Sequence, residues 1–274
     1  MSYTNPAAYE RFMGRWSAQL APMFLRFAQV KDGQHIADVG CGTGVLSRAI
    51  AASSPAARVT GIDPSREYLT FAARDLPAER MRFQVGRAEA LPLGDGVFDA
   101  ALALLVLQDF DEPERAVREM ARVTRTDGVV AACVWDFEHG LPMLSLLRQA
   151  TEAVAPDEAL ATSRKRHSGL QDLHALWRAC GLHTVVIETF EIGMVFASFD
   201  DYWQPVLGRS TPTSAFVAKV DEQTGGALAR VLREKISGMA PDGSFVLPAR
   251  AFAVRGLVSR KPLTPTANGE NREG

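Results

Sequence analysis

This 274-residue sequence lacks three features, and each absence narrows the classes of protein to which it can belong. No uninterrupted apolar run approaches the roughly 20 residues that a membrane-spanning helix requires. The first ten residues, MSYTNPAAYE, lack the basic start and the apolar stretch of a secretory signal. The three cysteines, Cys41, Cys133 and Cys180, fit neither a disulfide framework nor a structural zinc site. We therefore expect a cytoplasmic protein without a membrane partner.

An excess of charge of either sign is also missing. The 30 Lys and Arg residues nearly balance the 32 Asp and Glu residues, and the net charge is −2. A protein that binds nucleic acid usually carries a basic footprint, so no nucleic-acid partner is expected. The five histidines are scattered without ligand-like spacing, so no metal site is expected either. The partner that remains is a small molecule, and the sequence leaves open a monomer or a homodimer.

Strand-like and helix-like segments alternate through the first half of the chain. Apolar runs that end near residues 39, 63, 86, 107 and 137 are separated by helical patterns, and each run is almost continuously apolar. This rhythm is typical of an α/β protein whose mostly parallel sheet is covered by helices on both faces. The ligand crevice of such a Rossmann-like sheet lies at the carboxyl ends of its strands.

The rest of the chain divides into segments with different rhythms. Residues 1–34 contain an apolar stripe at helical spacing, Tyr9, Phe12, Trp16, Leu20, and predict a helical lid segment. Residues 35–139 form the ligand-binding core. Residues 140–261 add a strand near 183–192, a last strand at 250–260 and helical insertions that serve as a lid or substrate region. Residues 262–274 are polar and rich in Pro and Gly, and predict a disordered tail.

A glycine-rich stretch, IADVGCGTG, follows the first predicted strand directly. Gly40, Gly42 and Gly44 alternate there, two residues after Asp38. A dinucleotide site would show Gly-x-Gly-x-x-Gly and would not place a carboxylate near a pyrophosphate. Asp63 ends the second strand 19 residues past Gly44, where a ribose-binding carboxylate belongs in such folds. The pattern favours a nucleoside that carries a positive group, such as an amino acid's ammonium.

Four motifs in sequence order resemble class I S-adenosylmethionine-dependent methyltransferases. They are IADVGCGTGVLSRAI, VTGIDPS, RAEALPLGDGVFDAAL and VLQDF, and the resemblance spans about residues 35–137. The segments YERFMGRWS and RAFAVRG resemble a bacterial, type 11-like subgroup that acts on small molecules. The resemblance implies S-adenosyl-L-methionine as the cofactor. It also implies a seven-stranded sheet whose antiparallel last strand inserts between the fifth and sixth strands.

The resemblance also implies roles for individual residues. Asp38 and the loop hold the methionine part, Asp63 accepts hydrogen bonds from the ribose hydroxyls, and the backbone of Ala88 faces the adenine edge. The chain departs from the family at Arg87, where an acidic residue often binds the adenine amino group; either Glu89 replaces it, or water or backbone does. The full set of expected cofactor contacts is Asp38, Gly40, Cys41, Gly42, Gly44, Asp63, Pro64, Ala88, Glu89, Leu105, Gln108, Tyr9 and Trp16.

No residue stands out as a catalyst. Transfer of a methyl group from a sulfonium is an in-line displacement that needs mainly alignment and exclusion of water. His139 follows the fifth strand and is a weak candidate for a general base. Cys41 is better explained as a small side chain in a tight turn than as a nucleophile. The segment SRKRHS could clamp an anionic substrate, although a solvated loop is the better interpretation.

Two other functions remain as alternatives. One is a regulatory protein that binds S-adenosylmethionine or S-adenosylhomocysteine without catalysis. The other is a nicotinamide oxidoreductase, which the glycine spacing and Asp38 disfavour.

Overall fold

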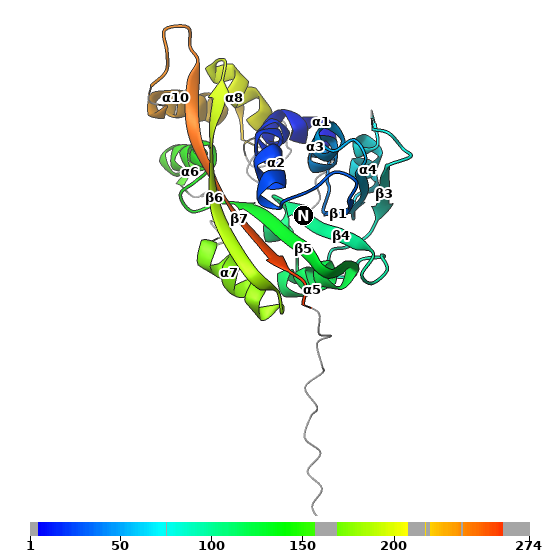
Figure 1. The fold of residues 1–274 in the computed structure, drawn as a ribbon. Coiled ribbons are helices and arrows are strands. Elements are labelled where there is room, and N and C mark those ends of the chain that lie inside the picture. Colours follow the sequence, from blue (N-terminus) through cyan, green and yellow to red (C-terminus); the bar gives the residue numbers. More distant parts are fainter. Residues whose placement is uncertain are drawn as a thin grey trace, which may run out of the picture.

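A computed structural model describes residues 5–74, 76–156, 169–207, 217, 220–236 and 238–259. They contain one seven-stranded sheet in the order β3-β2-β1-β4-β5-β7-β6, with helices on both faces (Figure 1). The strands are β1 (His35–Val39), β2 (Arg58–Asp63), β3 (Met81–Val85), β4 (Phe98–Leu104), β5 (Thr124–Trp135), β6 (His183–Phe196) and β7 (Phe245–Leu257). The Rossmann-like α/β fold expected from the sequence is confirmed.

The sheet is parallel from β3 to β5, and β7 runs antiparallel to both of its neighbours. The last strand therefore lies between the fifth and the sixth, as the resemblance implied. Because β1 and β4 are adjacent while β2 and β3 lie on the far side of β1, the strand order reverses at β1. The glycine-rich loop leaves β1 at this switch point, where open α/β sheets bind their ligands.

The last two strands are longer than the sequence indicates. β6 continues four residues beyond 192 and β7 begins five residues before 250, so that Phe196 pairs with Phe245. Gly193 and Pro248 usually weaken or end strands, which is why the sequence pattern stops there. In the structure these two residues lie directly opposite each other, and the pairing continues past them. The added ends of β6 and β7 project past the other strands of the sheet and lie beside helices α8 and α10 (Figure 1).

The helices cover the two faces with separate apolar clusters. One cluster joins the sheet to residues of α2, α3, α6, α8 and α10, and the other joins it to α5 and α7. The helices are α1 (Pro6–Tyr9), α2 (Arg15–Phe27), α3 (Val45–Ser53), α4 (Arg66–Ala72), α5 (Pro113–Val123), α6 (Pro142–Val154), α7 (Leu170–Ala179), α8 (Phe199–Val206) and α10 (Glu222–Lys235). A 3₁₀ turn, η2, spans Leu107–Asp109. None of the described helices is long and apolar enough to cross a membrane.

The N-terminal segment is helical as expected, but it is not uniform. Asn5 caps its first turn by accepting a hydrogen bond from the Ala8 amide at 2.9 Å. A π-helical turn, η1 (Glu10–Gly14), then separates α1 from α2. The apolar stripe of α2 is buried against one face of the sheet. Thus α2 adds to the core of the domain, whereas α1 contacts α4 at the carboxyl ends of the strands.

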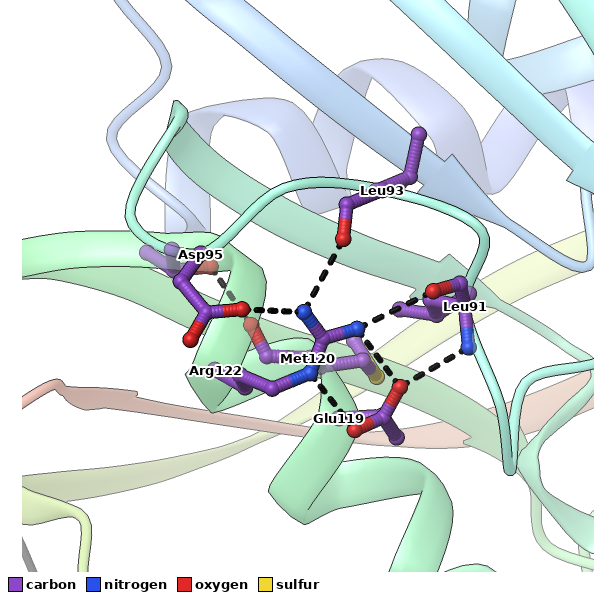
Figure 2. A network of polar contacts seen from close by, with 7 residues as sticks. Leu91, Leu93, Asp95, Glu119, Met120 and Arg122 are labelled. Atoms are coloured by element: carbon purple, nitrogen blue, oxygen red, sulfur yellow. Dashed lines mark hydrogen bonds and ion pairs between the residues drawn. The ribbon is translucent and has the colours of Figure 1, made fainter.

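The segment between β3 and β4 is fixed by one side chain of α5. The Arg122 guanidinium donates to the carbonyl oxygens of Leu91 and Leu93, at 3.0 and 2.9 Å, and also binds Asp95 and Glu119 (Figure 2). Glu119 in turn accepts a hydrogen bond from the Leu91 amide at 2.8 Å. These contacts determine how the chain passes from the end of β3 to the start of β4.

Two expectations lie outside the described residues. They concern the tail at 262–274 and the SRKRHS segment at 163–168.

Candidate cofactor-binding site

Backbone hydrogen bonds fix the glycine-rich loop against β2. The amides of Gly40 and Cys41 both donate to the Ile62 carbonyl oxygen, at 2.7 and 3.0 Å. Gly40, Gly42 and Gly44 have φ angles of 70°, 52° and 85°, in the left-handed region that favours glycine. The loop therefore has this path because glycines occupy all three positions.

The three glycines differ in what surrounds them. A Cβ on Gly40 would lie 2.7 Å from the Val106 methyl groups, and one on Gly44 would lie 2.9 Å from the Ala72 Cβ. A Cβ on Gly42 would meet only the Tyr68 ring, at 3.9 Å. Gly40 and Gly44 are thus required by packing within the protein, whereas Gly42 leaves backbone open on the side that faces α4.

Asp63 connects this loop to α4. One carboxylate oxygen accepts the Gly42 amide at 3.0 Å, and the other accepts the Ser65 amide at 2.9 Å. The Ser65 hydroxyl caps α4 by accepting the Tyr68 amide. Burial raises the pKa of Asp63, and the two backbone hydrogen bonds oppose that rise. Since each carboxylate oxygen can accept a second hydrogen bond, Asp63 retains capacity for ligand hydroxyls.

Asp38 is the more deeply buried carboxyl group. Only 1% of its surface is exposed, and the Ser47 hydroxyl donates to its Oδ2 at 2.7 Å. Burial raises the pKa of Asp38 to about 7, and the nearby Asp63 charge adds to the rise. A cation placed beside this carboxyl would stabilise its ionised form.

The turn that follows β4 packs directly on the glycine-rich loop. Leu105 has a φ of 59°, and its amide donates to the Cys133 carbonyl oxygen at 2.8 Å. Gln108 donates from its Nε2 to the Leu105 carbonyl oxygen at 2.7 Å. Its Oε1 is buried and has no partner among the residues that the structure describes. The Val106 side chain lies against Gly40, so this turn is beside the glycine-rich loop.

The residues after β3 form an internal ion-pair network. Glu89 accepts the Asp111 amide at 3.0 Å and lies 3.5 Å from the Arg87 Nε. Arg87 also pairs with the Asp111 carboxylate. Glu89 is therefore engaged within the protein, but each of its carboxylate oxygens can accept a second hydrogen bond, so it stays a candidate substitute for the missing acidic residue. Neighbouring Ala88 is buried, and Pro64 is exposed next to Asp63.

Tyr9 reaches this site from the N-terminal segment. Its ring lies edge-on to that of Tyr68, with centroids 6.1 Å apart. Burial raises the pKa of Tyr9 to about 12. Glu10 pairs with Arg48 at 3.2 Å, and Arg48 donates to the Thr43 carbonyl oxygen of the loop at 2.7 Å. Two contacts therefore connect the start of the chain to the surroundings of the glycine-rich loop.

Trp16 is placed elsewhere. Its ring packs on Phe196 of β6 at 5.1 Å, and the Arg15 guanidinium lies 4.2 Å from its centroid. Arg15 Nη1 also donates to both carboxylate oxygens of Asp201 in α8, at 2.8 and 3.0 Å. The structure groups Trp16 with β6 and α8 because the stripe of α2 faces the sheet, and it does not bring this residue to the loop.

The weak catalytic candidates gain no support. The His139 side chain is exposed, and its backbone amide donates to Asp136 at 3.0 Å. Cys41 is buried, and burial raises the pKa of its thiol, which opposes nucleophilic reactivity. No group of three His, Cys, Asp or Glu side chains that could hold a metal occurs in the described part of the chain. Tyr68, whose ring is nearest to the missing Gly42 Cβ, is not among the residues expected at this site, because its only signal in the sequence is an aromatic residue five positions after Asp63.

Residues 37–132 match the model of the family described as "Methyltransferase domain". Residues 37–132 are therefore a methyltransferase domain. Over these residues the match confirms the resemblance to class I methyltransferases, whose cofactor is S-adenosyl-L-methionine.

Among related sequences, the methyltransferase domain is similar to the O-methyltransferase cnsE of Penicillium expansum. The two are 37% identical over 131 residues, which are 46% of this chain and 46% of that protein. The chain spans less than half the length of the first three curated relatives that it matches.

Two solved structures illustrate the fold. The YcgJ protein of Bacillus subtilis has a TM-score of 0.56 at 18% identity, over 89% of this chain and 99% of that one. The [4+2]-cyclase SpnF has a TM-score of 0.55 at 21% identity, over 88% of this chain and 81% of that one. At these identities the likeness describes the fold, and it does not determine the reaction.

Proposed function

We propose that this protein is an S-adenosylmethionine-dependent methyltransferase that acts on a small molecule. The observation that carries the proposal is the open Gly42 backbone beside the Asp63 carboxylate, within a chain that contains a methyltransferase domain. The net charge of −2 favours a small acceptor over a nucleic acid. The three free thiols fit the reducing cytoplasm that we propose as its location.

The residues present fit this cofactor. Asp63 would accept the ribose hydroxyls, and the open face of Gly42 would allow the methionine part to approach the backbone. The ammonium group would lie on the side of Asp38, whose buried carboxyl gains stability in its ionised form from a cation. Ala88 would present its backbone to adenine, and Glu89, water or backbone would take the contact of the missing acidic residue.

The bound cofactor supplies a methyl group that its positive sulfur already activates toward nucleophiles. The protein must then position the acceptor in line and exclude water. We assign these roles to the turn that carries Leu105 and Gln108 and to Tyr9 in the N-terminal lid. Gln108 Oε1 is a buried acceptor still able to receive a hydrogen bond from a ligand, and Tyr9 adds an aromatic face that favours a cation. Tyr9 stays protonated at neutral pH, so it is no general base there.

A binding measurement followed by a turnover assay tests this function. Isothermal titration with S-adenosylhomocysteine and with NAD should give heat for the first ligand only. Incubation with S-adenosylmethionine and a panel of small hydroxyl, amine, thiol and carbon nucleophiles should then yield a methylated product and S-adenosylhomocysteine. Binding without turnover of any acceptor would favour the non-catalytic alternative. Binding of NAD without S-adenosylhomocysteine would contradict the proposal.

A further inference from the structure

The Tyr68 hydroxyl is a buried polar group that the proposed site has not yet used. Tyr68 lies in the first turn of α4 and is only 5% exposed. Its hydroxyl has no hydrogen-bond partner within the described residues. A buried hydroxyl without a partner destabilises a protein, because it loses its hydrogen bonds to water and gains none in return. Such a group in a ligand site indicates that the ligand supplies the partner.

The position of Tyr68 points to the same ligand as the glycine-rich loop. Its ring edge is the nearest group, at 3.9 Å, to the Cβ that Gly42 lacks. Its backbone is tied to Asp63 through the Ser65 cap, which fixes the first turn of α4 beside that carboxylate. The Tyr9 ring covers it from the N-terminal segment, with its centroid 6.1 Å away. Tyr68 thus lies between the open backbone of Gly42 and the Tyr9 ring of the N-terminal segment.

The chemistry of the surroundings makes the phenol a hydrogen-bond donor. Burial raises the pKa of Tyr68, and the nearby Tyr9, Asp63 and Glu10 raise it further. The hydroxyl therefore keeps its proton at neutral pH. A neutral phenol beside carboxylates can donate to an oxygen of a ligand that reaches over Gly42.

We propose that Tyr68 is a cofactor-binding residue whose hydroxyl donates a hydrogen bond to an oxygen of the bound nucleoside–amino acid. This inference rests on the proposed function, since it takes S-adenosylmethionine as the ligand. Two oxygens of that ligand are chemically suitable: a ribose oxygen and the amino acid carboxylate. They differ in charge, and therefore in the strength of the hydrogen bond that they accept.

The test is Tyr68→Phe, which removes only the hydroxyl. Isothermal titration is performed with S-adenosylhomocysteine and with 5′-methylthioadenosine, which keeps the ribose but lacks the carboxylate. A bond to the carboxylate predicts about a 10- to 100-fold loss of affinity for S-adenosylhomocysteine and none for 5′-methylthioadenosine. A bond to the ribose predicts about a 2- to 10-fold loss for both ligands. The melting temperature of the ligand-free variant should not fall, because no bond within the protein is broken.

Tyr202→Phe is the matched control. The Tyr202 hydroxyl is also buried, but it donates to the Met143 carbonyl oxygen at 2.8 Å. Its loss should lower the melting temperature and leave both affinities unchanged. Unchanged affinities in Tyr68→Phe would overturn the inference while the proposed function stands, and so would a melting temperature that falls as it does in Tyr202→Phe. A wild-type protein that binds neither ligand would contradict the proposed function itself, and the inference with it.

Discussion

The two sides of the sheet, one around β1 and the other formed by β7 and β6, differ in the length of their strands and in what stabilises them. At one end, which we call the cofactor region, β1, β2 and β4 are strands of 5 to 7 residues whose following turns are fixed by backbone hydrogen bonds. At the other end, which we call the extension, β6 and β7 are 14 and 13 residues long, and side chains on one face of their paired ends are buried. The rings of Trp16, Phe196, Tyr202 and Phe245 form one aromatic cluster in the extension.

We infer from this difference that cofactor binding and selection of the methyl acceptor lie in different regions of the sheet. The family model ends at residue 132, so it includes the cofactor region and none of β6, β7, α8 or α10. A site made of backbone can hold the same cofactor in many proteins, whereas a site made of side chains changes with each substitution. We therefore expect the extension to select the methyl acceptor, and variants of the two regions to fail in different ways.

The largest effect is expected at the open glycine. Gly42→Val places a branched side chain where the ligand would lie, and its φ of 52° adds strain. Affinity for S-adenosylhomocysteine should fall by more than about 100-fold, or about 3 kcal/mol, as measured by titration calorimetry. Gly33→Val is the control, because Gly33 has a φ of 79° and no heavy atom close to its missing Cβ. If Gly42→Val binds S-adenosylhomocysteine as tightly as the Gly33→Val control and the wild type do, the glycine-rich loop does not contact the ligand at Gly42.

A second large effect is expected at Asp63. Asp63→Ala removes the proposed acceptor of two ligand hydroxyl groups, and affinity for S-adenosylhomocysteine should weaken by about 1.5–3 kcal/mol. Asp221→Ala is the matched change in the extension, where the Asp221 carboxylate caps α10 by accepting the Thr224 amide at 2.7 Å. That variant should melt at a lower temperature and bind the cofactor normally. Equal affinity in Asp63→Ala and the wild type, with the fold intact, would remove Asp63 from the site.

A third prediction concerns the acid stability of the extension. Although burial raises the pKa of Asp136, its hydrogen bonds to the His139 and Glu138 amides and to Arg250 hold that pKa below the usual value. The stabilisation is complete above about pH 5, where the unfolded-state carboxyl is ionised too, and it is lost as pH falls through the folded-state pKa. Asp136→Asn should cost about 2 kcal/mol at pH 7.

Urea denaturation from pH 7 to pH 3 measures this effect. The difference between the wild type and Asp136→Asn should shrink as the pH falls, while affinity for the cofactor at pH 7 stays the same. A difference that is constant over the whole range would mean that the Asp136–Arg250 pair contributes no pH-dependent stability.

The smallest effect is a pH dependence of binding in the cofactor region. With a pKa of about 7 in the ligand-free protein, Asp38 must lose its proton when a cation binds beside it at lower pH. Affinity for S-adenosylhomocysteine should therefore fall by up to about tenfold per unit below pH 7 and level off above it. The ligand's own ammonium has a pKa of about 7.7 or above and stays mostly protonated below pH 7, so it does not cause the fall there.

Two variants sharpen this measurement. Asp38→Asn should abolish the dependence between pH 5.5 and 7.5. Ser47→Ala removes the hydrogen bond that lowers the pKa of Asp38 and should shift the dependence to higher pH. A flat profile in the wild type would show that no cation of the ligand lies beside Asp38.

The sequence predicted the strands β1 to β5 and the loop after β1 well because their signals are local. Buried parallel strands appear as apolar runs, and a tight loop needs glycines at fixed positions, so β1 to β5 and the Gly40–Gly44 loop could be recognised directly. The extension could not be delimited, because Gly193 and Pro248 weaken the strand pattern and only their mutual pairing preserves it. The engagement of Glu89 and the orphan hydroxyl of Tyr68 also depend on contacts between distant segments.

A crystal structure of the protein with S-adenosylhomocysteine tests the central claim most directly. The account predicts that the methionine part lies over the open backbone of Gly42 and that the ribose hydroxyls lie within hydrogen-bond distance of the Asp63 carboxylate. Ligand density at another place, or a Gly42 backbone covered by the protein's own side chains while the ligand is bound, would contradict it.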